Sequence, residues 1–191
     1  MTLLSIFGVG PQPSVVTDGD SRVLSDSPLR ADRDHNVGLR SVVGLETAPF
    51  RVDIQDPYTR EATMRALSGA SEWLAADRCQ LVFSEFRDDR GVPLVIKLNE
   101  LKTTPQGYLR LVMFRDGESH RTCAREGILA FTARLSRVVY LCGRKFERAS
   151  RRDVREVQAT IIHEMLHSLG LGENPPSPRH ISFRVARLCW S

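Results

Sequence analysis

The stretch "TIIHEMLHSLGLGENPPSPRH", residues 160–180, holds three of the chain's five histidines. His163 and His167 stand four residues apart, and Glu164 directly follows the first of them. Apolar residues around this stretch recur at helical spacing, so we expect a helix over residues 151–169. Because residues at i and i+4 of a helix project from one face, both imidazoles should lie on the same side, about one turn apart.

This pair of histidines predicts a metal site. Two imidazoles at that spacing can hold one Zn²⁺ with bonds of ~2.0–2.1 Å each. Zinc lowers the pKa of a bound water to about 7, and Glu164 beside the open coordination position can act as general base. The pattern His-Glu-x-x-His, spelled "HEMLH" here, is the zinc-hydrolase motif. The sequence therefore predicts Zn²⁺ as cofactor, with His163 and His167 as ligands and Glu164 as the catalytic residue.

The longer stretch "HEMLHSLGLGE" resembles the metzincin metallopeptidases, whose pattern is His-Glu-x-x-His-x-x-Gly-x-x-(His or Asp). His163, Glu164, His167 and Gly170 match it. The resemblance implies that Gly170 lets the chain leave the helix sharply, so that the residue three positions later returns to the metal. This chain has Glu173 there instead of His or Asp, and a carboxylate oxygen can also ligate zinc.

The third protein ligand has a second candidate in His180, seven residues beyond Glu173 and across the segment "NPPSP". A catalytic zinc takes three protein ligands and keeps its fourth position open. We favour Glu173, because a histidine near the start of a terminal helix is more often structural or exposed. A site completed by neither residue is the remaining alternative.

The resemblance also carries expectations about the fold, over residues 51–170. Metzincins place a long helix early, then a mixed sheet with an antiparallel edge strand along the cleft, then the zinc helix. They also carry a methionine-containing turn beneath the metal. Only 18 residues follow Glu173 here and none is methionine, so the floor of the site must be built differently, with the Pro175–Pro176 turn as the candidate.

Capping signals predict where the helices begin. Asp56 is a good N-cap with Pro57 at the first helical position, and apolar residues then recur at helical spacing over about five turns. Ser150, with an acidic residue three positions on, gives a capping signal for the histidine helix. Ser177 and Pro178 predict a short terminal helix.

Several β-rich runs predict strands, at residues 51–54, 79–86, 92–101, 109–117, 127–135 and 138–146. The expected fold class is α+β, with a mixed β-sheet of about five strands and two long helices. The second long helix carries the zinc motif, and a short C-terminal helix follows it.

Length, composition and charge limit the possible domain organisation and binding partners of the chain. The 191 residues fit one domain, with residues 1–46 a flexible or poorly ordered leader, rich in Pro, Ser, Asp and Gly, and residues 47–191 a zincin-like metallopeptidase domain. The formal charge of +4 is modest, and the basic run "GRKFERASRRDVR" (143–155) is predicted to be a solvated face. We therefore expect no nucleic acid and no membrane partner, but a monomer that acts on a peptide or protein substrate.

Four widely spaced cysteines contain no Cys-x-x-Cys pair, which argues against a cysteine zinc knuckle. An even count allows two disulfides, and we favour Cys79–Cys123 with Cys142–Cys189; four reduced thiols are the alternative. Disulfides favour an extracytoplasmic or secreted location, although the amino terminus has no recognisable signal peptide.

The leading interpretation is a zinc-dependent hydrolase, specifically a metallopeptidase in which Glu164 activates water to cleave peptide bonds. The alternative is a non-catalytic binding domain, a degenerate protease fold stabilised by zinc. A closed site holding both Glu173 and His180 would favour that alternative, because no position would remain for water. Hydrolysis of a small non-peptide amide is a third interpretation.

Overall fold

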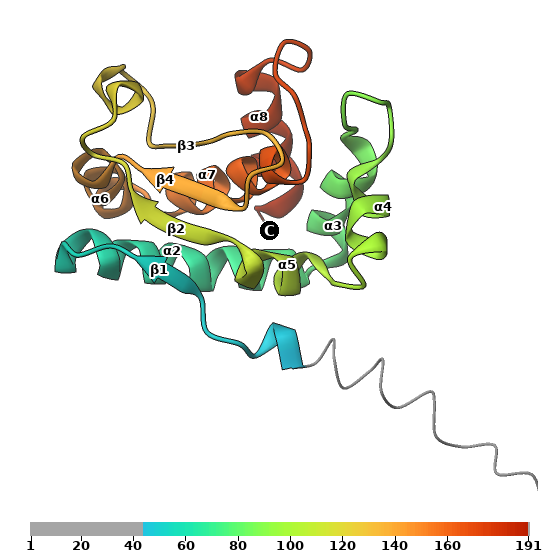
Figure 1. Cartoon of the computed structure of the whole chain (residues 1–191), viewed down its shortest axis with the longest axis horizontal. Coiled ribbons are helices and arrows are strands. Elements are labelled where there is room, and N and C mark those ends of the chain that lie inside the picture. The colour runs from blue at the N-terminus through green and yellow to red at the C-terminus, as the bar shows by residue number, and fades with distance from the viewer. Residues whose placement is uncertain (1–43, 191) are drawn as a thin grey trace, which may run out of the picture. The chain divides into compact units, whose positions relative to one another are not determined.

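The structure is a computed structural model and describes residues 44–190. Residues 1–43 of the predicted leader lie outside the described residues. The described chain forms four strands, one short 3₁₀ helix and seven α-helices of seven residues or more (Figure 1). None of these helices combines the length and apolarity that a membrane crossing requires. The helices are α2 (Pro57–Ala75), α3 (Asp77–Glu85), α4 (Leu94–Glu100), α5 (Pro105–Leu111), η1 (Arg121–Ala124), α6 (Gly143–Arg152), α7 (Val154–Ser168) and α8 (Pro178–Cys189).

The four strands form one mixed sheet in the order β1-β2-β4-β3. They are β1 (Arg51–Asp53), β2 (Met113–Asp116), β4 (Val138–Leu141) and β3 (Ala130–Thr132). The pairs β1–β2 and β2–β4 are parallel, whereas β3 runs antiparallel to β4 at the edge. The predicted α+β class with a mixed sheet is confirmed, with four strands rather than about five in the described chain.

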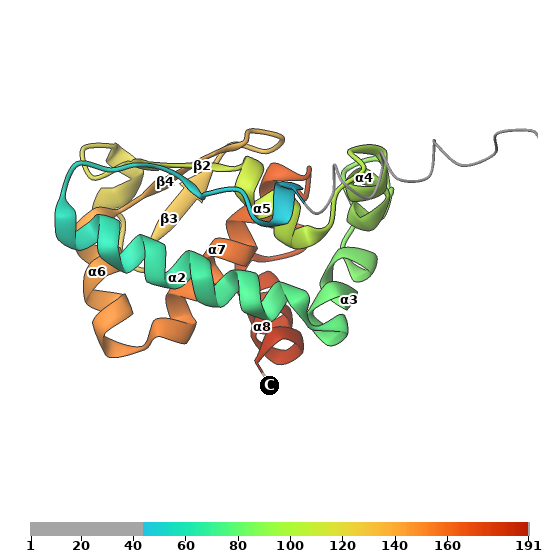
Figure 2. The same cartoon turned by 90° about the horizontal axis from the view of Figure 1, so that it is seen from below.

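The longest helix, α2, packs against α6 and α7 on one side of the sheet (Figure 2). Its predicted start is confirmed, since the Asp56 carboxylate accepts a hydrogen bond from the Thr59 amide at 2.7 Å and Pro57 opens the helix. Leu67 and Leu74 of this helix are fully buried in the core between the helices and the sheet. Helix α7, which carries the histidines, is thereby enclosed on several sides.

Two predicted strands are wrong. Residues 79–86 belong mostly to α3 and residues 92–101 mostly to α4. In α3 the buried side chains are Cys79, Val82 and Phe83, a spacing of three and four that fits a helix. In α4 they are Leu94 and Leu98, one helical turn apart. Both runs are rich in apolar residues, but the spacing of their buried positions is helical.

The other β-rich runs are only partly strands. The run 109–117 begins inside α5, whose N-cap Thr104 accepts a hydrogen bond from the Gly107 amide at 3.1 Å, and becomes β2 only afterwards. The run 127–135 contributes the short β3, and the run 138–146 ends as the first turn of α6. Helices α5 and α6 therefore take up part of the runs 109–117 and 138–146.

The predicted start of the histidine helix is also corrected. Residues 143–152 form the separate helix α6, and Ser150 is buried inside it instead of capping α7. Asp153 is the N-cap of α7, with its carboxylate accepting a hydrogen bond from the Arg155 amide at 2.9 Å. The terminal helix begins as predicted, because the Ser177 hydroxyl accepts from the His180 amide at 3.3 Å.

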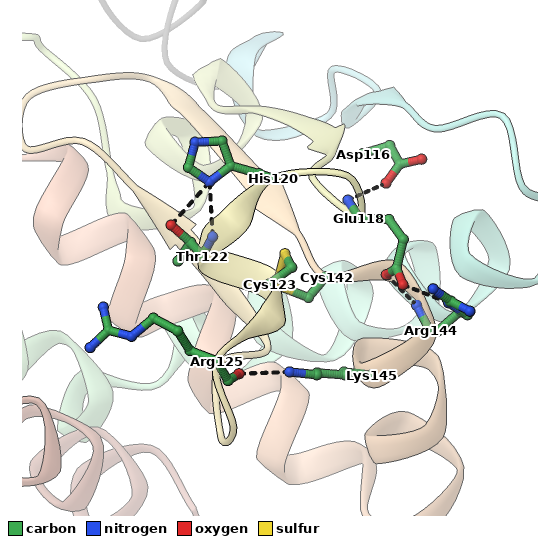
Figure 3. Close-up of a disulfide and its surroundings, with 9 residues drawn as sticks. All are labelled: Asp116, Glu118, His120, Thr122, Cys123, Arg125, Cys142, Arg144 and Lys145. Atoms are coloured by element: carbon green, nitrogen blue, oxygen red, sulfur yellow. Dashed lines mark hydrogen bonds and ion pairs between the residues drawn. A yellow bond between two sulfur atoms is a disulfide. The ribbon is translucent and has the colours of Figure 1, made fainter.

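The cysteines form two disulfides, but the predicted pairing is wrong. Cys79 of α3 pairs with Cys189 of α8, and Cys123 of η1 pairs with Cys142 at the start of α6. Helices α3 and α8 are distant in sequence but pack together, which brings the first pair within reach. Figure 3 shows the second pair, flanked by the ion pair between Glu118 and the Arg144 guanidinium.

Candidate metal centre

Helix α7 carries both histidines on a side enclosed by neighbouring elements, with β3 against it on one side and α8 on another (Figure 1). His163 is 8% exposed and His167 is 7% exposed. Their ring centroids lie 4.8 Å apart, and the two Nε2 atoms lie 2.9 Å apart. The helix therefore presents the two imidazoles as a pair, with the same nitrogen of each ring directed to a common point.

The turn after α7 brings a carboxylate to that point. Gly170 has a φ of +116°, a backbone conformation that side-chain-bearing residues rarely adopt, and its amide donates to the His167 carbonyl at 2.9 Å. The chain then reverses. As a result, Oε1 of Glu173 lies 3.2 Å from Nε2 of His167 and 3.8 Å from Nε2 of His163.

These three side chains, His163, His167 and Glu173, form a cluster that could hold a metal ion, called the metal cluster below. A tetrahedral ion with bonds of ~2.0–2.1 Å separates its ligand atoms by about 3.3–3.4 Å. The three separations in the cluster, 2.9, 3.2 and 3.8 Å, lie on both sides of that value. One ion can therefore contact all three atoms with only small side-chain adjustments.

The outer nitrogens of both rings are bonded to protein groups. Nδ1 of His167 lies 2.9 Å from the Leu171 carbonyl oxygen, and Nδ1 of His163 lies 2.9 Å from the Ser182 hydroxyl. A carbonyl can only accept, so Nδ1 of His167 carries a proton, and in the neutral ring the lone pair is then on Nε2, the atom that faces the cluster. Metal-binding histidines usually donate their other N–H in this way.

Burial shifts the pKa values of Glu164 and His163 in opposite directions. Burial, assisted by the nearby charge of Glu173 and opposed by a hydrogen bond from the Thr132 backbone, raises the pKa of the Glu164 carboxyl to about 8. Burial, assisted by the neighbouring His167, lowers the pKa of His163 to about 3. His163 is therefore neutral at physiological pH, which is the form that binds metals.

A cleft of about 1270 Å³ opens beside the metal cluster and Glu164. Strand β3 and the residues before it line one wall. Helix α8 lines another wall with Phe183 and Ala186, three residues apart on one side of the helix, and Trp190, which directly follows the helix, extends this wall. The cleft is larger than a typical small-molecule site, so it has room for an extended substrate.

His180, the other candidate for the third ligand, does not join the metal cluster. Its ring lies edge-on to Phe86, with centroids 6.2 Å apart, and the residue is exposed near the start of α8. The Pro175–Pro176 turn is likewise not among the residues that line the cleft. The structure thus brings Glu173 to the histidines and leaves His180 outside.

Sequence reasoning missed three groups that contact the site. They are the Ser182 hydroxyl, the Leu171 carbonyl and the Thr132 backbone. A carbonyl and a backbone amide have no sequence signature. Ser182 is 19 residues from His163 on a separate helix, and no local pattern links the two residues.

Comparison with known proteins gives no relative for this chain: no family model, no curated protein and no solved structure matches it.

Proposed function

We propose that this protein is a zinc-dependent hydrolase, a metallopeptidase with a metzincin-like arrangement of its motif. The main support is the convergence of two Nε2 atoms and one carboxylate oxygen within 3.8 Å of each other, beside the buried carboxyl of Glu164. Structural zinc sites usually have four protein ligands, whereas this cluster offers three and borders an open cleft. Three ligands leave a coordination position for water or substrate.

Zinc is the metal that best suits these ligands. Two imidazoles and one carboxylate form a known ligand set of catalytic zinc sites. Magnesium and calcium favour all-oxygen sites, and the cysteines that soft metals prefer are held in disulfides away from the cluster. When bound, Zn²⁺ would supply Lewis-acid chemistry at neutral pH.

Glu164 is the group that would move protons. It lies within the motif between the two histidines, is 7% exposed, and is oriented by the hydrogen bond from the Thr132 backbone. As a carboxylate it would take a proton from the attacking water and then deliver it to the leaving nitrogen. The positive charge of a metal held by the cluster would favour the carboxylate form and so counteract the effect of burial.

The substrate is proposed to be a peptide because, among the described strands, the edge strand of the sheet borders the site. Strand β3 pairs with β4 on one side only, and its residues Ala130–Thr132 line the cleft. An extended peptide can add to such an edge through backbone hydrogen bonds. A scissile bond in that peptide would then lie next to Glu164, since Thr132 contacts this side chain.

The proposal is tested with Glu164→Ala and His167→Ala. Glu164→Ala should keep near-stoichiometric zinc and lose hydrolysis, because the metal cluster stays intact while the proton acceptor is removed. His167→Ala should lose both. Zinc is measured by elemental analysis, and hydrolysis by mass spectrometry of new termini in a random peptide library. Cleavage by the Glu164 variant at the wild-type rate would show that the mechanism is wrong.

The non-catalytic alternative makes a different prediction for the same protein. A hydroxamate such as acetohydroxamate binds a zinc ion that has an open position but not one whose coordination is closed. The placement of His180 outside the cluster supports an open site. Tight zinc binding without hydroxamate binding or peptide cleavage would favour a structural metal and rule out the enzyme.

A further inference from the structure

Helix α8 reaches the metal cluster through the side chain of Ser182, whose Oγ lies 2.9 Å from Nδ1 of His163. We propose that Ser182 is the positioning residue of His163: its hydroxyl accepts the Nδ1–H hydrogen bond and fixes the ring with Nε2 toward the metal. The C-terminal helix would then complete the metal site from the side that the turn after α7 does not reach. This inference rests on the zinc site proposed above.

The two histidines are supported in different ways. His167 is held by the carbonyl of Leu171, which belongs to the turn that directly follows α7. A backbone carbonyl four residues away keeps its place whenever the turn forms. The Nδ1 atom of His163 is instead bonded to a side chain from another helix, 19 residues away. The orientation of His163 therefore depends on where α8 packs and on one replaceable hydroxyl group.

Helix α8 is held firmly enough to serve this purpose. The Cys79–Cys189 disulfide ties its last residue to α3. The Arg184 guanidinium, two residues beyond Ser182, makes a two-point ion pair with the Glu85 carboxylate of α3, with one contact at 2.6 Å. Both links to α3 lie within seven residues of Ser182, on its C-terminal side, and hold this part of α8 against α3.

Removing the hydroxyl should weaken metal binding without unfolding the protein. Ser182→Ala leaves the Nδ1–H of His163 with no protein acceptor, and losing such an outer hydrogen bond typically costs about 10–100-fold in metal affinity. Ser182→Thr keeps a hydroxyl on the same carbon and should stay within about threefold of wild type. Ser182 faces the cleft and is exposed, so neither change disturbs the core.

The test measures zinc affinity by competition with a chromophoric chelator, for wild type, Ser182→Ala and Ser182→Thr. The matched control is Ser177→Ala, which removes the N-cap of the same helix but no contact of His163. We expect the control to bind zinc like wild type, although losing a cap costs about 1 kcal/mol of stability. Urea unfolding with a chelator present verifies that each variant folds.

A spectroscopic measurement separates positioning from a general structural effect. In the zinc-loaded protein, the Nδ1–H proton of His163 should give a downfield NMR signal in wild type and Ser182→Thr. Exchange with water should remove it in Ser182→Ala. Wild-type affinity with this signal retained in Ser182→Ala would overturn the positioning role and leave the zinc site standing. A wild-type protein that binds no zinc would overturn both the zinc site and the positioning role. If Ser182→Ala loses affinity and Ser182→Thr does not restore it, the positioning role alone is overturned.

Discussion

Replacing Glu164 with glutamine should stabilise the metal-free protein at neutral and alkaline pH. Burial, with a further contribution from Glu173, raises the pKa of the Glu164 carboxyl from 4.5 to about 8 in the folded state. In the unfolded chain the same carboxyl ionises near its ordinary pKa. Between these two values the folded state holds a proton that the unfolded state has released, so ionisation favours unfolding.

The direction and magnitude of the change in the free energy of unfolding follow from the interval between the two pKa values of Glu164. The contribution of Glu164 to stability is fully present below about pH 4.5, falls as the pH rises, and is lost above about pH 8. Each pH unit changes the free energy of unfolding by about 1.4 kcal/mol, so the whole interval corresponds to roughly 5 kcal/mol. Glutamine has a similar shape, cannot ionise, and can still accept the hydrogen bond from the Thr132 backbone.

The assay is urea unfolding of wild type and Glu164→Gln in the presence of EDTA, from about pH 4.5 to 8.5. The difference between the two proteins isolates residue 164, because all other titrating groups are shared. It should grow in favour of glutamine as the pH rises. Glu61→Gln, at an exposed position of α2, is the control and should show a nearly constant difference. A pH-independent difference for Glu164→Gln would refute the argument that burial keeps this carboxyl protonated.

Three other predictions concern the surroundings of the site. The Cys79→Ser/Cys189→Ser double variant should lose about 4–5 kcal/mol of stability in urea unfolding, because the bridge spans 110 residues; an unchanged unfolding midpoint would contradict this. Gly170→Ala should cost about 1–3 kcal/mol and weaken zinc binding, since its φ is +116° and a Cβ would meet Leu135 at 3.0 Å; unaltered stability and affinity would contradict the proposed turn. His180→Ala should keep wild-type zinc content by elemental analysis, whereas loss of zinc would make His180 a ligand.

The starts of α2 and α8 and the turn after α7 could be predicted because local chemistry determines them. Asp56 and Ser177 accept cap hydrogen bonds within three residues, and Gly170 ends α7 through its own backbone conformation. The i and i+4 spacing of His163 and His167 likewise fixes their common face once the helix forms. In the metal cluster, helix geometry alone accounts for the placement of the two histidines. The carboxylate of Glu173 reaches them because the chain reverses direction at Gly170.

The features that could not be predicted depend on contacts between distant segments. Cys79 pairs with Cys189 because α3 packs on α8, a contact between segments 110 residues apart that no local pattern indicates. Ser182 approaches His163 for the same reason, since the position of α8 determines it. The run 92–101 is rich in apolar residues, but its two buried leucines, Leu94 and Leu98, lie one helical turn apart, as in a helix.

The most direct test of the zinc site is a crystal structure of the protein soaked with ZnCl₂, with anomalous diffraction recorded at the zinc edge. We predict one strong peak within about 2.0–2.2 Å of Nε2 of His163, Nε2 of His167 and a carboxylate oxygen of Glu173, with a coordination position left open toward the cleft. No peak among these three atoms, or a zinc ion bound elsewhere with the cluster unchanged, would contradict the proposed metal centre.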